Sequence, residues 1–169
     1  MATGVTSEFE ASLRSLGVTW TRTESGSFAT TIDEAVTAPA VGTPLPFDGV
    51  SLDDTGVVRD PTPGELDAAA TGVTPAEMGI ADYGSIVLAP SAAGHEPVSL
   101  YTERHVAVLA ASDVVPDMPT AFERLGEAFA AGNDDAIIAT GPSATADMGA
   151  LVEGAHGPKE VHVVVLEDR

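Results

Sequence analysis

Cysteine is absent from all 169 residues of the chain. Disulfide bonds, thiolate catalysis and iron–sulfur clusters held by cysteines of this chain are therefore excluded. Any redox chemistry in which the protein takes part must use a bound cofactor or a partner protein.

Long apolar runs are also absent. Runs such as Val163–Leu166 are far shorter than the roughly 20 residues that a membrane-spanning helix needs. The N-terminal residues Met1–Gly4 show no basic segment followed by an apolar stretch, so no secretory signal is predicted. We expect a cytoplasmic protein without a membrane span.

Basic residues are scarce. The chain has seven Lys and Arg residues and 26 Asp and Glu residues, which gives a net charge of −19. Lys159 is the single lysine. Acids spread along the whole chain, together with many small residues, are typical of a halophile's surface; an ordinary acidic protein is the alternative. Such a charge destabilises the compact state unless salt screens it. Nucleic acid is a poor partner, because binding its phosphates requires basic patches.

Short apolar runs flanked by turn residues predict buried strands. The strands expected most firmly are Ser85–Ala89, His105–Ala110, Ala136–Thr140 and Val161–Leu166. Helices are expected to begin at Ser7, Thr31, Thr62, Thr120 and Ser143. This alternation predicts one α/β domain over residues 1–169, a three-layer αβα sandwich whose mainly parallel central sheet holds all four strands. Residues 39–64 are rich in proline and give no clear pattern.

Two stretches near the C-terminus form a composite motif. The first, Thr140–Met148, reads TGPSATADM, and the second, Gly154–Val163, reads GAHGPKEVHV. A third stretch, Gly79–Leu88, reads GIADYGSIVL and leads into a predicted strand. In order and spacing these stretches resemble the closing signature and the G-x-AETG[ST] segment of the lactate-utilisation (LUD) domain family, and the chain is similar to the family's small, single-domain C-type members.

The resemblance implies a fold like that of the glucosamine-6-phosphate deaminase, ribose-5-phosphate isomerase and CoA-transferase group. It also implies a role in oxidising L-lactate to pyruvate together with separate iron–sulfur proteins. Family members often carry arginine where this chain has Ala144, which removes a natural anion clamp. Whether the chain is itself an enzyme stays open.

The turn Gly141-Pro142-Ser143 is expected to leave a strand and enter a helix. Backbone N–H groups at such a helix start can bind an anion; a helix cap at Ser143 is the alternative. Thr145 and Asp147 follow in the first helical turn, where a carboxylate is favoured by the helix dipole and could also face a ligand.

A glycine-rich loop holds His156 and Gly157. His156 there could donate a proton or contact a ligand, or it could bond a backbone carbonyl. We expect this loop and the Gly141–Ser143 turn to form one wall of a cleft at the carboxyl ends of the strands. Asp82, Gly84 and Ser85 are weaker candidates for the same ligand site.

Other kinds of site find no support in the sequence. The four histidines show neither HxxxH nor HxH spacing, so no metal site is predicted. No nucleotide-binding glycine motif occurs, and we expect no cofactor held by this chain.

Three functions remain as hypotheses. The first is a ligand-binding or assembly subunit of lactate oxidation with iron–sulfur partner proteins. The second is an enzyme acting on a small phosphorylated or CoA-linked metabolite, and the third is a regulatory module that binds such a metabolite without catalysis.

Overall fold

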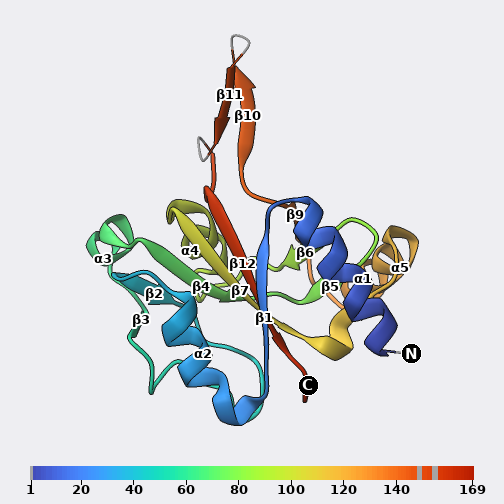
Figure 1. The fold of residues 1–169 in the computed structure, drawn as a ribbon, viewed down its shortest axis with the longest axis horizontal. Coiled ribbons are helices and arrows are strands. Elements are labelled where there is room, and N and C mark those ends of the chain that lie inside the picture. The colour runs from blue at the N-terminus through green and yellow to red at the C-terminus, as the bar shows by residue number, and fades with distance from the viewer. Residues whose placement is uncertain (1, 148–149, 154–155) are drawn as a thin grey trace.

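Six parallel strands form the central sheet of the computed structural model (Figure 1). The strands, in spatial order, are β1 (Thr19–Thr23), β12 (Glu160–Leu166), β7 (Arg104–Ala110), β4 (Thr71–Pro75), β2 (Ala40–Gly42) and β3 (Val57–Arg59). The structure describes residues 2–147, 150–153 and 156–169, and the side chains of residues 4–144 and 156–169. The mainly parallel sheet of the predicted α/β fold is confirmed.

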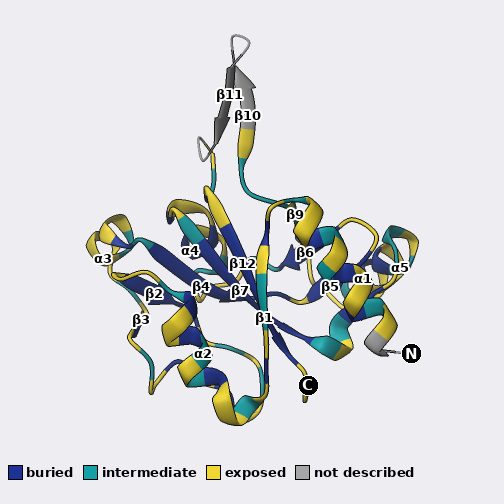
Figure 2. Ribbon diagram, viewed as in Figure 1, coloured by how far each residue is buried: buried dark blue, intermediate teal, exposed yellow. Residues whose placement is uncertain are grey.

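The valine-rich strand β12 is buried on both sides because its side chains alternate between two cores. Val163 and Val165 join a cluster on one face, while Val164 and Leu166 join a cluster on the other. Figure 2 shows the central strands as the most buried part of the molecule. The uninterrupted apolar run Val163–Leu166 is what a parallel sheet covered on both faces favours.

Helices cover both faces of this sheet. Helix α2 (Phe28–Ala35) packs Phe28 and Ile32 on one face, together with Leu52 from the loop between β2 and β3. Helix α1 (Ala2–Ser15) packs Phe9 and Leu13 on the other. Two short helices, α3 (Pro63–Ala68) and α4 (His95–Tyr101), meet around Val41 of β2.

A second sheet of four strands lies over the face that carries α1. Its strands, in order, are β8 (Val114–Val115), β5 (Met78–Ile80), β6 (Ser85–Leu88) and β9 (Ile137–Thr140). Ile86 and Leu88 point into the core shared with the central sheet, whereas Val87 points outward beneath α5 (Met118–Ala130).

This second sheet corrects the predicted strand arrangement. The four strands expected in one sheet are divided, with β7 and β12 in the central sheet and β6 and β9 in the second sheet. Strand β6 is buried at every position because α5 covers one side and the central sheet the other. Its sequence pattern is therefore the same as that of a central strand.

An antiparallel hairpin projects from the domain where a helix was predicted to begin at Ser143 (Figure 1). Its strands are β10 (Ala144–Asp147) and β11 (Ala150–Glu153). The Ser143 N–H donates to the Pro158 carbonyl at 2.8 Å, which pins together the two ends of the segment. A helix of ten residues would hold its ends about 15 Å apart, so the chain must double back instead.

Several predicted helix starts also differ. Helix α1 begins at Ala2 rather than Ser7, and α2 begins at Phe28 rather than Thr31. Helix α5 is capped by Asp117, with Thr120 as the donor to the cap. The predicted start at Thr62 is confirmed, since Thr62 and Glu65 form a capping box. Among the described residues no helix has both the length and the apolarity of a membrane span.

Candidate functional site

A cavity of about 300 Å³ lies between the two sheets. The central sheet contributes His105, Val161 and Val163, and the second sheet contributes Ile86 and Leu88 from β6 together with β9. The full lining consists of Leu13, Val18, Gly84, Ile86, Leu88, Ser99, Leu100, His105, Ile137, Ala139, Thr140, Gly141, Pro142, Ser143, Ala144, His156, Gly157, Pro158, Val161 and Val163.

The turn at Gly141 follows the carboxyl end of β9, as expected, but the cavity does not lie at the carboxyl ends of the central strands. His105 and Val161 are the second residues of β7 and β12, so the cavity lies toward the amino ends of these strands. The rule for open sheets applies where loops surround the carboxyl ends. Here the second sheet covers a face of the central sheet, and the cavity forms between the two layers.

The two loops of the composite motif meet at this cavity. The Ser143 N–H donates to the Pro158 carbonyl at 2.8 Å. A Cβ atom added at Gly157 would lie 3.1 Å from the Ser143 Cβ, so glycine allows the close approach of the two loops. Gly141, Pro142, Ser143, His156 and Gly157 all line the cavity.

Gly84 reaches the cavity from the turn before β6. Its φ is +64°, and an added Cβ would lie 2.9 Å from the Ser12 carbonyl carbon, so a side chain would be strained and would clash with α1. Glycine at this position allows the end of α1 to close one side of the cavity.

Two predicted site residues, Ser85 and Asp82, lie outside the described lining. Ser85 is buried behind it, where its Oγ shares a 2.7 Å hydrogen bond with Oγ1 of Thr140. Asp82 is exposed, and its backbone N–H donates to the Pro116 carbonyl. Thr145 and Asp147 belong to β10, and their side chains lie outside the described part of the structure.

The helix start that would have supported an anion at Gly141–Ser143 does not exist. The chain continues from Ser143 into β10, so no helix dipole points at the turn. Pro142 has no N–H group, and the N–H of Ser143 is already bonded to Pro158. The backbone of Pro142 and Ser143 therefore offers no free donor to an anion.

His105 lines the cavity although its position in a strand gave no reason to expect it there. It is buried, and its Nε2 lies 2.8 Å from Oγ1 of Thr74. Burial lowers the pKa of His105 to about 4, so the ring is neutral at pH 7. The sequence does not predict that the second sheet lies across this strand.

His162 lies within hydrogen-bonding distance of two threonine side chains of the neighbouring strand β1. Thr19 Oγ1 lies 2.7 Å from its Nδ1, and Thr21 Oγ1 lies 3.2 Å from its Nε2. Burial, and then the nearby Arg104 charge, lower the pKa of His162 to about 4. The two threonines join β12 to the edge strand β1.

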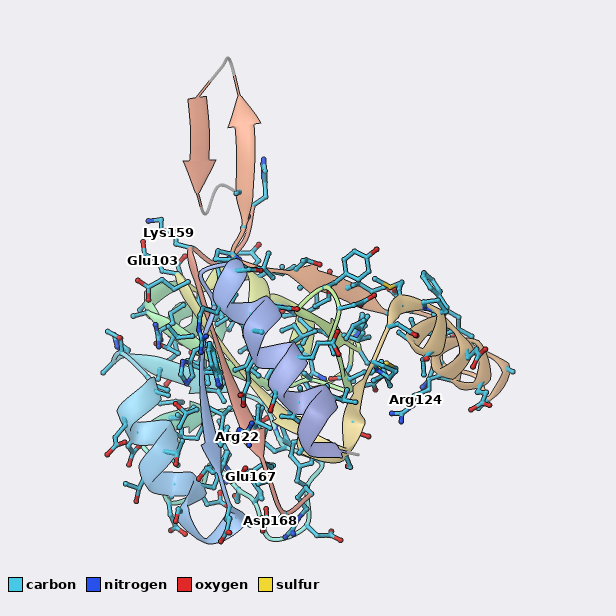
Figure 3. All side chains as sticks on the ribbon, turned by 45° about the vertical axis from the view of Figure 1, so that its right-hand side comes forward. Arg22, Glu103, Arg124, Lys159, Glu167 and Asp168 are labelled. Carbon is cyan, nitrogen blue, oxygen red and sulfur yellow. The ribbon has the colours of Figure 1, made fainter. Side chains whose placement is uncertain are left out.

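Lysine and arginine are absent from the described residues that line the cavity. Lys159 lies in an adjoining pocket that shares Leu100, His156 and Gly157, and its Nζ is 2.8 Å from Glu103 Oε1 (Figure 3). Within the described ranges no group of three His, Asp or Glu residues could hold a metal ion. The site thus offers aliphatic walls, hydroxyl groups and histidine rings.

Comparison with known proteins places this architecture in a family. The family model of the LUD domain matches residues 16–166. A crystal structure of a DUF162 family protein from Deinococcus radiodurans superposes with a TM-score of 0.75 at 20% sequence identity, covering 99% of each chain.

Curated relatives are similar in sequence. Lactate utilization protein C of Deinococcus radiodurans is 29% identical over 170 residues, covering 94% of this chain and 78% of that protein. Lactate utilization protein C of Bacillus licheniformis is 36% identical over 107 residues, covering 60% of this chain and 44% of that protein. Protein YkgG of Escherichia coli is 32% identical over 121 residues, covering 66% and 52%. The chain thus spans about half the length of the last two relatives.

Proposed function

The chain belongs to the LUD domain family, and on that premise we propose that it is a component of L-lactate utilisation in the cytoplasm. The observation that carries the proposal is the similarity to lactate utilization protein C of Deinococcus radiodurans, which extends over 94% of this chain. The role proposed for the chain is that of a subunit that binds a small molecule in the cavity between the two sheets.

The proposed partner is an iron–sulfur protein. Oxidation of lactate to pyruvate releases two electrons, and a chain without cysteine has no thiolates to hold a cluster. The electrons must therefore pass to another component. A subunit that binds a ligand or assembles the complex fits this division of roles.

Phosphorylated and CoA-linked metabolites are less well supported as ligands. The described cavity lining lacks the Lys and Arg side chains that bind phosphate groups. Neither class of metabolite is therefore proposed as the ligand of the cavity.

Deletion of the gene in its source organism tests the proposed function. Growth on L-lactate as the sole carbon source should be lost or strongly slowed, while growth on pyruvate should be unchanged. Equal growth of the deletion and parent strains on L-lactate would refute the role.

Affinity purification of the tagged chain at native expression tests the proposed partner. The expected result is recovery of an iron–sulfur protein in molar salt, with its visible absorption. Recovery of the chain alone would contradict a stable complex.

A further inference from the structure

We propose that the cavity between the two sheets binds an uncharged, largely apolar organic molecule about the size of one substituted ring. This inference rests on the proposed function, in which the cavity is the ligand site, and it specifies the chemical class of the ligand. It replaces the anion that the sequence suggested for the Gly141–Ser143 turn.

Electrostatics argue against an anionic ligand. No Lys or Arg is among the described lining residues. The nearby Lys159 is already paired with Glu103. Moving an anion out of water without a cationic partner is strongly unfavourable.

Three polar side chains that line the cavity, Ser99, Thr140 and His105, already have hydrogen-bond partners outside the lining. Ser99 Oγ donates to the Glu96 carbonyl at 2.8 Å, and the hydroxyls of Ser85 and Thr140 share a hydrogen bond. His105 is neutral because it is buried, and its Nε2 is bonded to Thr74. Such groups can exchange a hydrogen bond with a carbonyl, amide or hydroxyl, but they provide no counter-charge.

The walls between these polar groups are aliphatic. Leu88, Ile137, Val161 and Val163 come from both sheets and face the same space. A volume of about 300 Å³ is at the small end of the range for ligand sites in proteins. One ring with a short polar substituent suits this combination of size, apolar wall and few hydrogen-bonding groups.

Benzamide and benzoate are suitable probes because they have nearly the same shape and differ in charge. Calorimetric titration of the full chain in molar KCl would measure both affinities, since this salt concentration screens the long-range repulsion of the net charge. The expected result is that benzamide binds at least about tenfold more tightly than benzoate. Equal affinities, tighter binding of benzoate, or no binding of either probe would overturn the proposal.

Two variants show whether binding occurs in the cavity. Ala139→Phe fills the space from β9 and should abolish benzamide binding, whereas Ala92→Phe at an exposed loop position should leave it unchanged. If Ala139→Phe does not fold, amide chemical shifts of the wild-type protein replace it. Benzamide should then shift the signals of Gly84 and Gly157, and an effect confined to other residues would refute the site.

Failure of this inference can be told from failure of the proposed function. The probe titrations use purified protein and do not depend on lactate. Preferred binding of benzoate would overturn the ligand class and leave a lactate growth defect unaffected. Normal growth of the deletion strain on lactate would overturn the function and leave the charge preference of the cavity unaffected.

Discussion

At the scale of single residues, close approaches of backbone segments explain several glycines. A Cβ atom at Gly72 of β4 would lie 2.1 Å from the carbonyl oxygen of Val98 in α4. A substitution there must push the helix away from the sheet. A matched control exists at Gly126 in α5, where no heavy atom lies within 4 Å of an added Cβ.

Gly72→Ala should therefore destabilise the protein by about 3 kcal/mol or more, as expected for strong overpacking of a core. Gly126→Ala should stabilise it by about 0.5–1 kcal/mol through higher helix propensity. Chemical denaturation in molar salt measures both changes. A neutral effect of Gly72→Ala would show that α4 does not pack against β4 as closely as described.

Two buried histidines predict a dependence of stability on pH. The pKa values of His105 and His162 are about 4 in the folded protein, below the usual histidine value of about 6.5. Between these limits the unfolded chain binds protons that the folded protein does not bind. The contribution of the two neutral histidines to the free energy of unfolding is therefore complete above pH 6.5 and decreases as the pH falls toward 4.

The free energy of unfolding should fall by up to about 1.4 kcal/mol per pH unit for each of the two histidines between pH 6 and pH 5. Denaturant titrations at constant molar salt provide the measurement. The NMR signal of the His105 ring should stay that of the neutral form at pH 5. Equal stability at pH 7 and pH 5, or a charged His105 ring, would contradict this account.

The sequence identified much of the cavity wall at the residue scale. The motif predicts Gly141, Ser143, His156 and Gly157 as site residues, and all of them line one cavity. The sequence does not predict His105 as a site residue, because a histidine in an apolar strand gives no sign of whether it faces the core or a cavity. That distinction depends on where the second sheet lies, which is a tertiary property.

At the scale of elements, two predictions were wrong for physical reasons: the placement of β6 in the central sheet, and the helix after Ser143. Strand β6 is buried on both sides, and this pattern does not reveal whether its neighbours belong to the central sheet or to a second sheet. The segment after Ser143 has a plausible helix start in its sequence. Its ends are nevertheless joined by the bond from Ser143 to Pro158, a contact that sequence propensity does not include.

The residues that precede α5 and α2 test the role of helix caps in stability. Asp117 caps α5, because its Oδ1 accepts hydrogen bonds from the Thr120 N–H at 2.9 Å and from the Thr120 hydroxyl at 2.6 Å. Ser27 occupies the same position before α2, but its side chain makes no capping hydrogen bond. The two residues therefore form a matched pair.

Asp117→Ala should lower the free energy of unfolding by about 1 kcal/mol, the usual effect of losing a helix cap. Ser27→Ala should change it by less than about 0.5 kcal/mol, because no cap is lost. Urea denaturation of both variants checks the difference. Equal losses in the two variants would show that the Asp117 side chain is not a cap.

At the scale of the whole molecule, the net charge of −19 is the dominant property. The 26 Asp and Glu residues greatly outnumber the seven Lys and Arg residues. Surface ion pairs such as Arg22 with Glu10 and Glu167 contribute little individually (Figure 3). Stability should therefore depend on screening of repulsion by dissolved ions.

The fold should become less stable when KCl is lowered from molar to tens of millimolar concentration, because the screening length grows from about 3 Å to tens of ångströms. Chemical denaturation at both salt concentrations measures the change. Sucrose at low salt serves as the control, since it stabilises folded proteins without screening charge. Equal stability at the two salt concentrations would show that charge repulsion does not limit the fold.

The cavity between the two sheets is the proposed ligand site through which the protein serves lactate utilisation. The most direct measurement is growth on L-lactate of the deletion strain carrying either Ala139→Phe, which fills the cavity, or Ala92→Phe, which lies on the surface. Both proteins must first be shown to accumulate in folded form. The account predicts that Ala92→Phe restores growth and Ala139→Phe does not, whereas full growth with a folded Ala139→Phe protein would contradict it.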